Sequence, residues 1–362
     1  MPTAAAMLSS NMEGYEKGVS PVRIFIFSYG NMNNHSSPSL AIEAHGLVRN
    51  FGAVRAVDGV ELAVRKGEIY GFLGPNGAGK TTVIRMLVTL LAPTGGRATV
   101  AGHDIMREAD RVRSRIGVAL QEAALDNKQT GRELLRLQGQ LYGLGRREVA
   151  RRIEELSGLV DIGDAMDRLI GTYSGGMKRR LDLAAALIHY PDVLFLDEPT
   201  TGLDPISRTR IWEEVSYINS NLGVTVFLTT QYLEEADALA ERVGIIDQGR
   251  LAAEGPPGEL KRALGSDLIV ARLEGDAGLA VEALSGIPSV SAIECHDGEI
   301  TISASSGASV ISAVALRLNE SGLAVQELTL RTPTLDDVFL QVTGSRFRSN
   351  GAAQISDDEE AN

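Results

Sequence analysis

The stretch Gly74-Pro75-Asn76-Gly77-Ala78-Gly79-Lys80-Thr81-Thr82 decides the fold of this chain of 362 residues. It matches the pattern G-x-x-x-x-G-K-[ST], and a predicted strand, Glu68–Leu73, precedes it while a helical run, Thr82–Leu91, follows. Glycines in such a turn let backbone N–H groups point at phosphate oxygens, and the helix N-terminus adds partial positive charge. We expect Lys80 to reach the β- and γ-phosphates and the Thr81 hydroxyl to ligate Mg²⁺. The stretch therefore predicts a nucleoside-triphosphate site.

A second apolar run ends in two carboxylates. Val193–Leu196 leads directly into Asp197 and Glu198. Because α/β sheets bind ligands at the carboxyl ends of their strands, we expect this pair to lie beside the phosphate loop. Asp197 is then a candidate Mg²⁺ ligand, and Glu198 a candidate for orienting and polarising the attacking water. Such a pair is common by chance, so its interpretation depends on the phosphate loop.

A third motif opens a helix. Ser174-Gly175-Gly176-Met177-Lys178 begins a helical run to about His189, with Ser174 as a good N-cap and two glycines that leave the N-terminus open to an anion. This helix spans ~22 Å, whereas the strand Val193–Leu196 returns only ~13 Å. We therefore expect Ser174 to lie too far from Asp197 to touch the same nucleotide, which favours its presentation by a second copy of the chain.

Charge and pattern divide the chain into parts. Residues 40–265 carry 28 basic and 30 acidic side chains, whereas residues 266–343 carry 3 and 11, and Pro256-Pro257-Gly258 precedes the boundary. Met32 is a candidate start, because recognisable pattern begins only at Ala41. The predicted parts are a disordered N-terminal extension (1–39), a nucleotide-binding domain (40–265), an accessory domain (266–343) and an acidic disordered tail (344–362).

The first domain alternates short apolar runs with helical periods, which predicts an α/β fold with a largely parallel sheet. Residues 131–170 interrupt the alternation with helical pattern only, so we predict an inserted helical subdomain over about 122–180. One interpretation of its arginines is a nucleic-acid-binding patch, but a solvated helix face, on which they pair with neighbouring glutamates, is favoured. These arginines are Arg146, Arg147, Arg151 and Arg152.

The second domain follows the order βαββαβ, which predicts a ferredoxin-like split. Asp297-Gly298 between its middle strands is a strong hairpin signal. Thr334 with Asp337 predicts a capping box that opens a short last helix through Leu340. Cys295 and His296 are adjacent in the sequence and would face opposite sides of a strand end, so we expect no metal site there.

The composition excludes several classes of protein. The chain has 35 basic and 47 acidic residues, a net charge of −12, which argues against a general nucleic-acid binder. Its one cysteine forms no internal disulfide, which favours a reducing compartment. No apolar run reaches the ~18–20 residues that span a bilayer, and the N-terminus shows no basic region followed by a long apolar stretch. We expect a soluble cytoplasmic protein that meets a membrane only through a partner.

The motifs together resemble those of an ABC transporter ATP-binding subunit over about residues 41–260. A closer likeness is to the daunorubicin-resistance type of drug-exporter ATPase, and it rests on Tyr173–Asp182, Thr229–Asp237 and Leu335–Gly344. The resemblance implies a P-loop NTPase (ABC ATPase) domain with an inserted helical subdomain, ahead of the small α+β ferredoxin-like domain. The motifs occur in the family's order: the phosphate loop, Gln121, Tyr173–Met177, Val193–Thr200, Gly202–Pro205 and Thr229–Gln231.

Further roles are implied by the resemblance alone. Phe51 would stack on adenine, Gln121 would touch Mg²⁺ and the attacking water, and Asp204 would join the two sites of a dimer. The γ-phosphate held by the other subunit would be gripped by Ser174, Gly175 and Gly176. Such proteins form a homodimer around ATP, below a separately encoded multi-spanning permease.

Gln231 departs from the general family pattern, which has histidine at this position. An amide donates a hydrogen bond to a γ-phosphate, but it neither exchanges a proton nor carries charge. We therefore expect slow turnover, with positioning by Gln231 and water activation by Glu198.

The predicted function is an ATP-hydrolysing subunit of an ABC exporter, peripheral on the inner face of the cell membrane, that energises efflux of a hydrophobic drug or antibiotic-like compound. ATP and Mg²⁺ are the implied cofactors, and no nucleic acid is expected as a partner. One alternative is a non-transport soluble ABC ATPase acting on a cytoplasmic machine such as the ribosome, although proteins of that kind usually carry two cassettes. An importer ATPase is a second alternative.

Overall fold

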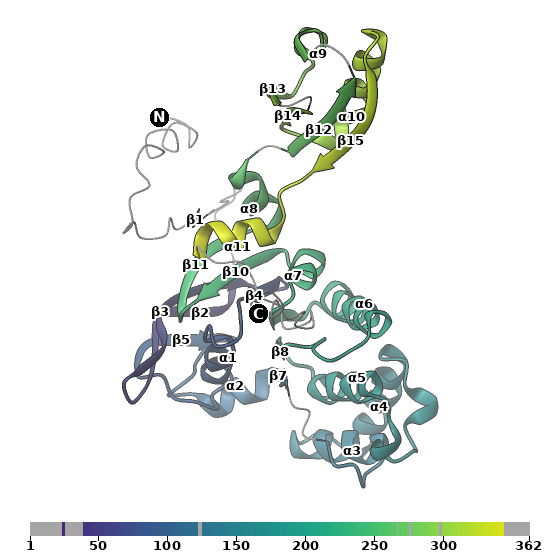
Figure 1. Ribbon diagram of the computed structural model, residues 1–362. Helices are drawn as coiled ribbons and strands as arrows, with labels where there is room; N and C mark the ends of the chain where they lie inside the picture. The colour runs from purple at the N-terminus through teal and green to yellow at the C-terminus, as the bar shows by residue number, and fades with distance from the viewer. Residues whose placement is uncertain are drawn as a thin grey trace, which may run out of the picture.

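The computed structural model describes residues 24–25, 39–121, 125–265, 267–274, 277–296 and 299–343. Its described part contains three sheets, and the last of them stands apart from the other two (Figure 1). Most of the N-terminal extension and the whole acidic tail, 344–362, lie outside the described residues. Within the extension, β1 (Ile24–Phe25) pairs in parallel with β11.

A seven-stranded sheet carries the nucleotide-binding domain. Its strands lie in the order β1-β11-β10-β4-β9-β8-β7, and the run from β10 to β7 is parallel. Strands β4, β8 and β9 are buried at every residue, because helices and the second sheet cover both faces. The bounds are β4 Ile69–Leu73, β7 Ile116–Ala119, β8 Val193–Asp197, β9 Thr225–Thr230, β10 Arg242–Asp247 and β11 Arg250–Gly255.

Aromatic packing fixes the centre of this sheet. The Phe227 ring of β9 lies 5.6 Å from Tyr70 and 5.5 Å from Phe72, both on β4, and 5.6 Å from Phe195 on β8, measured between ring centroids. Pairs at this distance contribute about 0.5–1.5 kcal/mol beyond the burial of their area. The three strands are therefore held in one register.

A second, antiparallel sheet packs over the first helix. Its order is β3-β2-β5-β6, with β2 Leu40–Phe51, β3 Val54–Arg65, β5 Gly95–Val100 and β6 His103–Asp104. Alternating apolar residues of β2 and β3 form a core with α1 (Lys80–Leu87) and α2 (Ala109–Arg115).

The helical region lies beside the sheet and shares a core with it. It contains α3 (Gly131–Leu141), α4 (Arg146–Leu159) and α5 (Gly175–Leu187), with 3-10 turns at Gly163–Ala165 and Ile170–Thr172. A capping box between Thr130 and Glu133 begins α3. Two further helices, α6 (Pro205–Leu222) and α7 (Leu233–Leu239), flank the sheet. No helix in the described ranges is long and apolar enough to cross a membrane.

The α+β C-terminal domain has its own core and is ferredoxin-like, as the sequence predicts. The sheet order is β13-β14-β12-β15, and every neighbouring pair is antiparallel. Asp297-Gly298 lie outside the described residues, but His296 pairs opposite Glu299 across them. Helix α8, Pro257–Leu264, precedes this domain, and the bounds within it are β12 Asp267–Glu274, α9 Ala277–Leu284, β13 Val290–His296, β14 Glu299–Ala304, α10 Gly307–Glu320 and β15 Ala324–Arg331.

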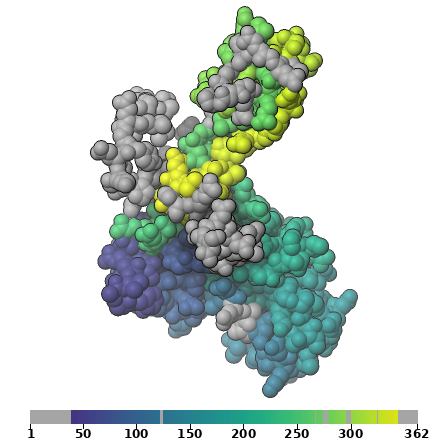
Figure 2. Space-filling model, viewed as in Figure 1, coloured from purple at the N-terminus to yellow at the C-terminus, as the bar shows by residue number. Residues whose placement is uncertain are grey.

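The last helix, α11 (Leu335–Thr343), returns to the nucleotide-binding domain (Figures 1 and 2). The predicted capping box is present: the Asp337 N–H donates to the Thr334 hydroxyl at 3.3 Å, and the Thr334 N–H donates to the Asp337 carboxylate at 2.8 Å. The sequence grouping placed this helix with the accessory domain. In the structure its apolar face packs on α7, α8 and β11, because apolar side chains of these elements form one core with it. The shared core includes Leu73, Ala236, Val243, Leu260, Leu335, Val338, Phe339 and Val342.

We predict that Phe339→Ala lowers the free energy of unfolding by about 3 kcal/mol, because it leaves a cavity in this core. Phe339 is 1% exposed, whereas its neighbour Leu340 is 37% exposed. Leu340→Ala is therefore the matched control and should change stability by less than about 1 kcal/mol. Chemical denaturation of both variants measures the difference. Equal losses of unfolding free energy would contradict the packing of α11 described above.

Candidate functional site

The phosphate loop connects β4 to α1 and admits few side chains. A Cβ on Gly74 would lie 2.5 Å from the Ile246 carbonyl oxygen, and one on Gly79 would lie 2.6 Å from that of Ala56. Gly79 also has a φ of 108°, in the left-handed region that favours glycine. No side chain caps α1, so its first N–H groups remain available to an anion. The loop has the geometry that a phosphate chain requires.

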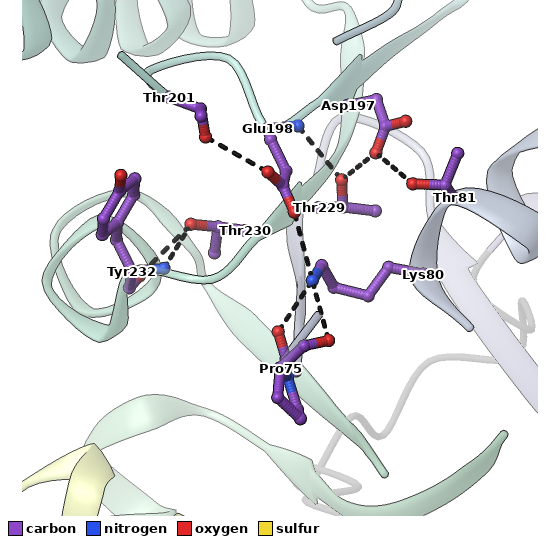
Figure 3. Close-up of polar contacts among 10 residues, drawn as sticks. Pro75, Lys80, Thr81, Asp197, Glu198, Thr201, Thr229, Thr230 and Tyr232 are labelled. Atoms are coloured by element: carbon purple, nitrogen blue, oxygen red, sulfur yellow. Dashed lines mark hydrogen bonds and ion pairs between the residues drawn. The ribbon is translucent and has the colours of Figure 1, made fainter. Parts of the chain in front are cut away.

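Lys80 is buried at the centre of this loop. Its ammonium donates hydrogen bonds to the Gly74 carbonyl at 2.8 Å and to the Pro75 carbonyl at 3.1 Å, and it lies 3.2 Å from the Glu198 carboxylate (Figure 3). Burial lowers the pKa of Lys80, and the charge of Glu198 opposes that shift. The lysine and Glu198 thus form a buried ion pair inside the loop.

Asp197 ends β8 opposite the start of α1. The Thr81 hydroxyl donates to its carboxylate at 3.4 Å, and the Thr229 hydroxyl of β9 donates to the same oxygen at 2.5 Å (Figure 3). A hydroxyl and a carboxylate placed together are ligands that suit Mg²⁺. The donor set therefore fits a magnesium ion held between Thr81 and Asp197.

Glu198 has a strained backbone. Its φ is 48°, which is uncommon for a residue with a side chain, and its N–H donates to both the hydroxyl and the carbonyl of Thr229 at 3.1 Å. The Thr201 hydroxyl donates to its second carboxylate oxygen at 3.2 Å. These contacts turn the side chain back toward Lys80, where a water attacking a bound phosphate would need a base.

Gln231 lies just after the end of β9, the strand that pairs with β8 and so with Asp197. It follows Thr229 and Thr230 at the end of β9 and is 8% exposed. The Thr230 hydroxyl accepts the Tyr232 N–H at 2.8 Å and shapes the turn that leads into α7. The structure thus brings Gln231 to the same sheet edge as Asp197 and Glu198.

Two predicted residues gather at a different place. The Ser174 hydroxyl caps α5 by accepting the Met177 N–H at 3.2 Å, and Asp204 caps α6 by accepting the Ser207 N–H at 3.0 Å. A Cβ on Gly176 would lie 3.1 Å from the Ser207 hydroxyl, so the two helix starts are neighbours. Among the described residues, Ser174 and Asp204 form hydrogen bonds within these helix starts and not with the phosphate loop.

Phe51 and Gln121 are exposed. Phe51 ends the long strand β2 with 46% of its surface accessible, and the Arg49 guanidinium lies 4.6 Å from its ring centroid. Gln121 follows β7 at the edge where β8 ends, and residues 122–124 after it lie outside the description. An exposed aromatic of this kind can stack on a base.

Thr229 and Glu235 are two residues whose part the sequence did not reveal. Thr229 bonds both Asp197 and Glu198, and only its place in a Thr-Thr-Gln run marks it. Glu235 of α7 is fully buried and accepts hydrogen bonds from the Thr200 hydroxyl at 2.9 Å and from the Trp212 indole at 3.0 Å. Burial raises the pKa of Glu235. The indole N–H of Trp212 is therefore paired with a buried carboxylate.

Comparisons with known proteins place the chain in a family. The family model described as ABC transporter matches residues 57–201, and the one described as ATP-binding protein DrrA1-3-like, C-terminal domain, matches residues 255–343. The chain is 47% identical to the daunorubicin resistance ATP-binding protein DrrA3 of Streptomyces coeruleorubidus, over 86% of this chain and 99% of that protein. It is 36% identical to the linearmycin resistance ATP-binding protein LnrL of Bacillus subtilis, over 85% and 99%.

Solved structures show the same fold. The structure titled as the ATP binding subunit of an ABC transporter superposes with a TM-score of 0.57 at 26% identity, over 62% of this chain and 93% of that chain. The cbiO1 protein of Clostridium perfringens, described as part of an ABC transporter complex, also gives 0.57 at 26% identity, over 61% and 90%. Both cover about the length of the nucleotide-binding domain.

We predict that raising the pH destabilises the protein through Glu235. Because burial raises its folded-state pKa above the unfolded value, the stabilising contribution is complete below the unfolded pKa and is lost as pH rises through the folded pKa. Relative to Glu235→Gln, the free energy of unfolding of the native protein should fall by up to about 1.4 kcal/mol per pH unit in that window.

Denaturation followed by fluorescence of Trp212, the one tryptophan of the chain, measures both proteins at each pH. Other titrating groups, such as Glu214, whose pKa burial raises to about 8, contribute equally to both and cancel in the difference. A difference that does not change with pH would contradict the prediction.

Proposed function

The chain belongs to the ABC transporter ATP-binding proteins, and from this premise we propose that two copies of it enclose ATP and drive export of a hydrophobic, drug-like compound through a separately encoded membrane permease. Proteins of this family bind and hydrolyse ATP. Relatives named for resistance to daunorubicin, doxorubicin and linearmycin support the class of compound. The same names favour an exporter over an importer or a soluble machine ATPase.

One observation carries the dimeric reading: each chain holds its predicted ATP contacts in two separate places. Lys80 pairs with Glu198, and Thr229 bonds both Glu198 and Asp197 at one sheet edge, whereas Ser174 and Asp204 lie together at the starts of α5 and α6. A second copy completes the site by presenting Ser174 of the partner subunit to the γ-phosphate. Gly175 and Gly176 leave that helix start open to the anion.

The buried pair of Lys80 and Glu198 suggests how binding prepares hydrolysis. A γ-phosphate in the loop competes with Glu198 for the same ammonium. When the phosphate takes Lys80, Glu198 loses its ion pair while Thr201 and Thr229 still hold its orientation. The freed carboxylate then accepts a proton from the attacking water.

Magnesium fits between Thr81 and Asp197 and, when bound, neutralises charge on the phosphates. Thr229 keeps Asp197 oriented for this by its hydrogen bond. The exposed Phe51 stacks on adenine. Gln121, which lies just after β7, responds to whether a γ-phosphate is bound.

The dimer acts by population shift. Two ATP molecules bind only the closed dimer, so they stabilise it over the open one, and hydrolysis removes that stabilisation. The protein works at the inner face of the membrane through its contact with the permease, and no step requires a nucleic acid.

We predict that Glu198→Gln retains ATP binding, lowers kcat by about 10²–10³-fold and traps an ATP-bound dimer, because the amide accepts no proton. Size-exclusion chromatography with and without ATP measures the dimer. Lys80→Ala is the control, since it removes the phosphate contact and should give neither binding nor a dimer. Full turnover by Glu198→Gln would contradict the role of Glu198.

The exporter proposal is tested with the same trapped variant. Tagged Glu198→Gln protein, purified from gently solubilised native membranes with ATP, should bring down a multi-spanning protein that mass spectrometry identifies. The Lys80→Ala protein, handled identically, sets the background. Recovery of a soluble homodimer alone, or of ribosomal proteins, would contradict export and leave the ATP chemistry intact.

We predict that Gln231→His raises kcat by about 10-fold, because an imidazole exchanges protons where an amide only donates. Steady-state hydrolysis at saturating ATP measures it, and Gln231→Ala, which removes the γ-phosphate contact, should be slower than the native protein. A hydrolysis rate unchanged by histidine would show that this position only packs.

A further inference from the structure

Arg179 is a buried arginine that the site described so far does not use. It lies on α5, in the turn after the helix start at Ser174, and is 9% exposed. Burial lowers its pKa, and the nearby Asp182 opposes that shift. A guanidinium removed from water needs most of its N–H groups paired, so its partners show what it holds.

Those partners are backbone carbonyls at the ends of two strands. The Nε of Arg179 donates to the Pro199 carbonyl at 3.0 Å, and Nη2 donates to the Asp197 carbonyl at 3.2 Å. These two carbonyls flank Glu198. Nη1 donates to the Leu120 carbonyl at 2.6 Å, directly before Gln121, and to the Asp182 carboxylate at 3.1 Å.

One rigid group therefore connects three functional segments. The planar guanidinium bonds the residues on each side of the catalytic carboxylate, the residue before Gln121, and its own helix α5. A lysine at this position would keep the charge but would lack the fork that reaches separate carbonyls at once. The start of α5 cannot shift relative to Glu198 and Gln121 without breaking these hydrogen bonds.

We propose that Arg179 is a positioning residue that couples the two ATP sites of the dimer. This inference rests on the proposed function, in which α5 presents Ser174 to the ATP of the other subunit. Arg179 transmits the position of Glu198 and Gln121, which respond to the ATP of their own subunit, to the helix start that contacts the ATP of the other. Each subunit thus reports the state of its own site across the interface.

Mixed dimers separate this coupling from a local role. Two differently tagged chains are purified as a pair in which one subunit carries Glu198→Gln, so only the other subunit's Glu198 hydrolyses ATP. Arg179→Met is then placed either in the subunit with the active Glu198 or in the subunit with Glu198→Gln. In the second placement it reaches the active site only through α5.

We expect both placements to lower kcat by about 10-fold or more, since a small misplacement of a contact group costs this much, while the ATP affinity of each separate chain stays within about twofold. Arg179→Lys should lose activity in both placements as well. A loss confined to the first placement, or native activity of Arg179→Lys, would overturn the inference.

Arg152→Met is the matched control. Arg152 is 6% exposed on α4 and donates to the Leu187 carbonyl at 2.8 Å, so its loss also removes a buried cation and a helix contact. It bonds no residue of the site and should leave kcat unchanged in both placements. An equal loss from Arg152→Met would assign the effect to general loosening and contradict coupling by Arg179. Failure of the parent Glu198→Gln chain to dimerise with ATP would instead contradict the proposed function, and the inference with it.

Discussion

The register between β4, β9 and β8 is the constraint on which the site depends. Phe227 packs against aromatic rings of both neighbouring strands, and the parallel pairing sets Leu73 opposite Thr230 and Asp197 opposite Thr229. Because parallel strands end at the same edge, the phosphate loop, the two carboxylates and the turn with Gln231 emerge together. A slip of one residue would turn each of these side chains to the other face of the sheet.

Because of that register, Thr229 bonds both acidic residues of the candidate site. Its hydroxyl donates to Asp197 and accepts the Glu198 N–H. One side chain therefore orients Asp197, the candidate magnesium ligand, and stabilises the strained backbone of Glu198, the candidate base. Arg179 holds the same segment from the other side through the carbonyls that flank Glu198. The candidate catalytic carboxylate of Glu198 is thus fixed by a neighbouring strand and by the helix that begins at Ser174, which gives the proposed coupling between sites a physical route.

The C-terminal part shows where sequence pattern reaches its limit. The order βαββαβ predicted the ferredoxin-like unit, because the hydrophobic periodicity of each strand and helix is visible in consecutive residues of the sequence. The same reasoning grouped the last helix with that unit. The packing position of α11 depends on an apolar surface formed by Leu73, Ala236 and Val243. These residues lie far from α11 in the sequence, so the hydrophobic periodicity of the helix does not indicate where it packs.

The sequence by itself determined the nucleotide loop and the strand-end carboxylates, because each is a short motif whose spacing carries its geometry, and it determined the α/β class through the alternation of apolar runs and helical periods. Only the tertiary structure decided which partners hold them. The bridge by Thr229, the ion pair of Lys80 with Glu198, and the burial of Glu235 and Arg179 all join segments separated by many residues. Hydrogen bonds of this kind depend on strand order and helix packing, which folding sets for the whole chain at once.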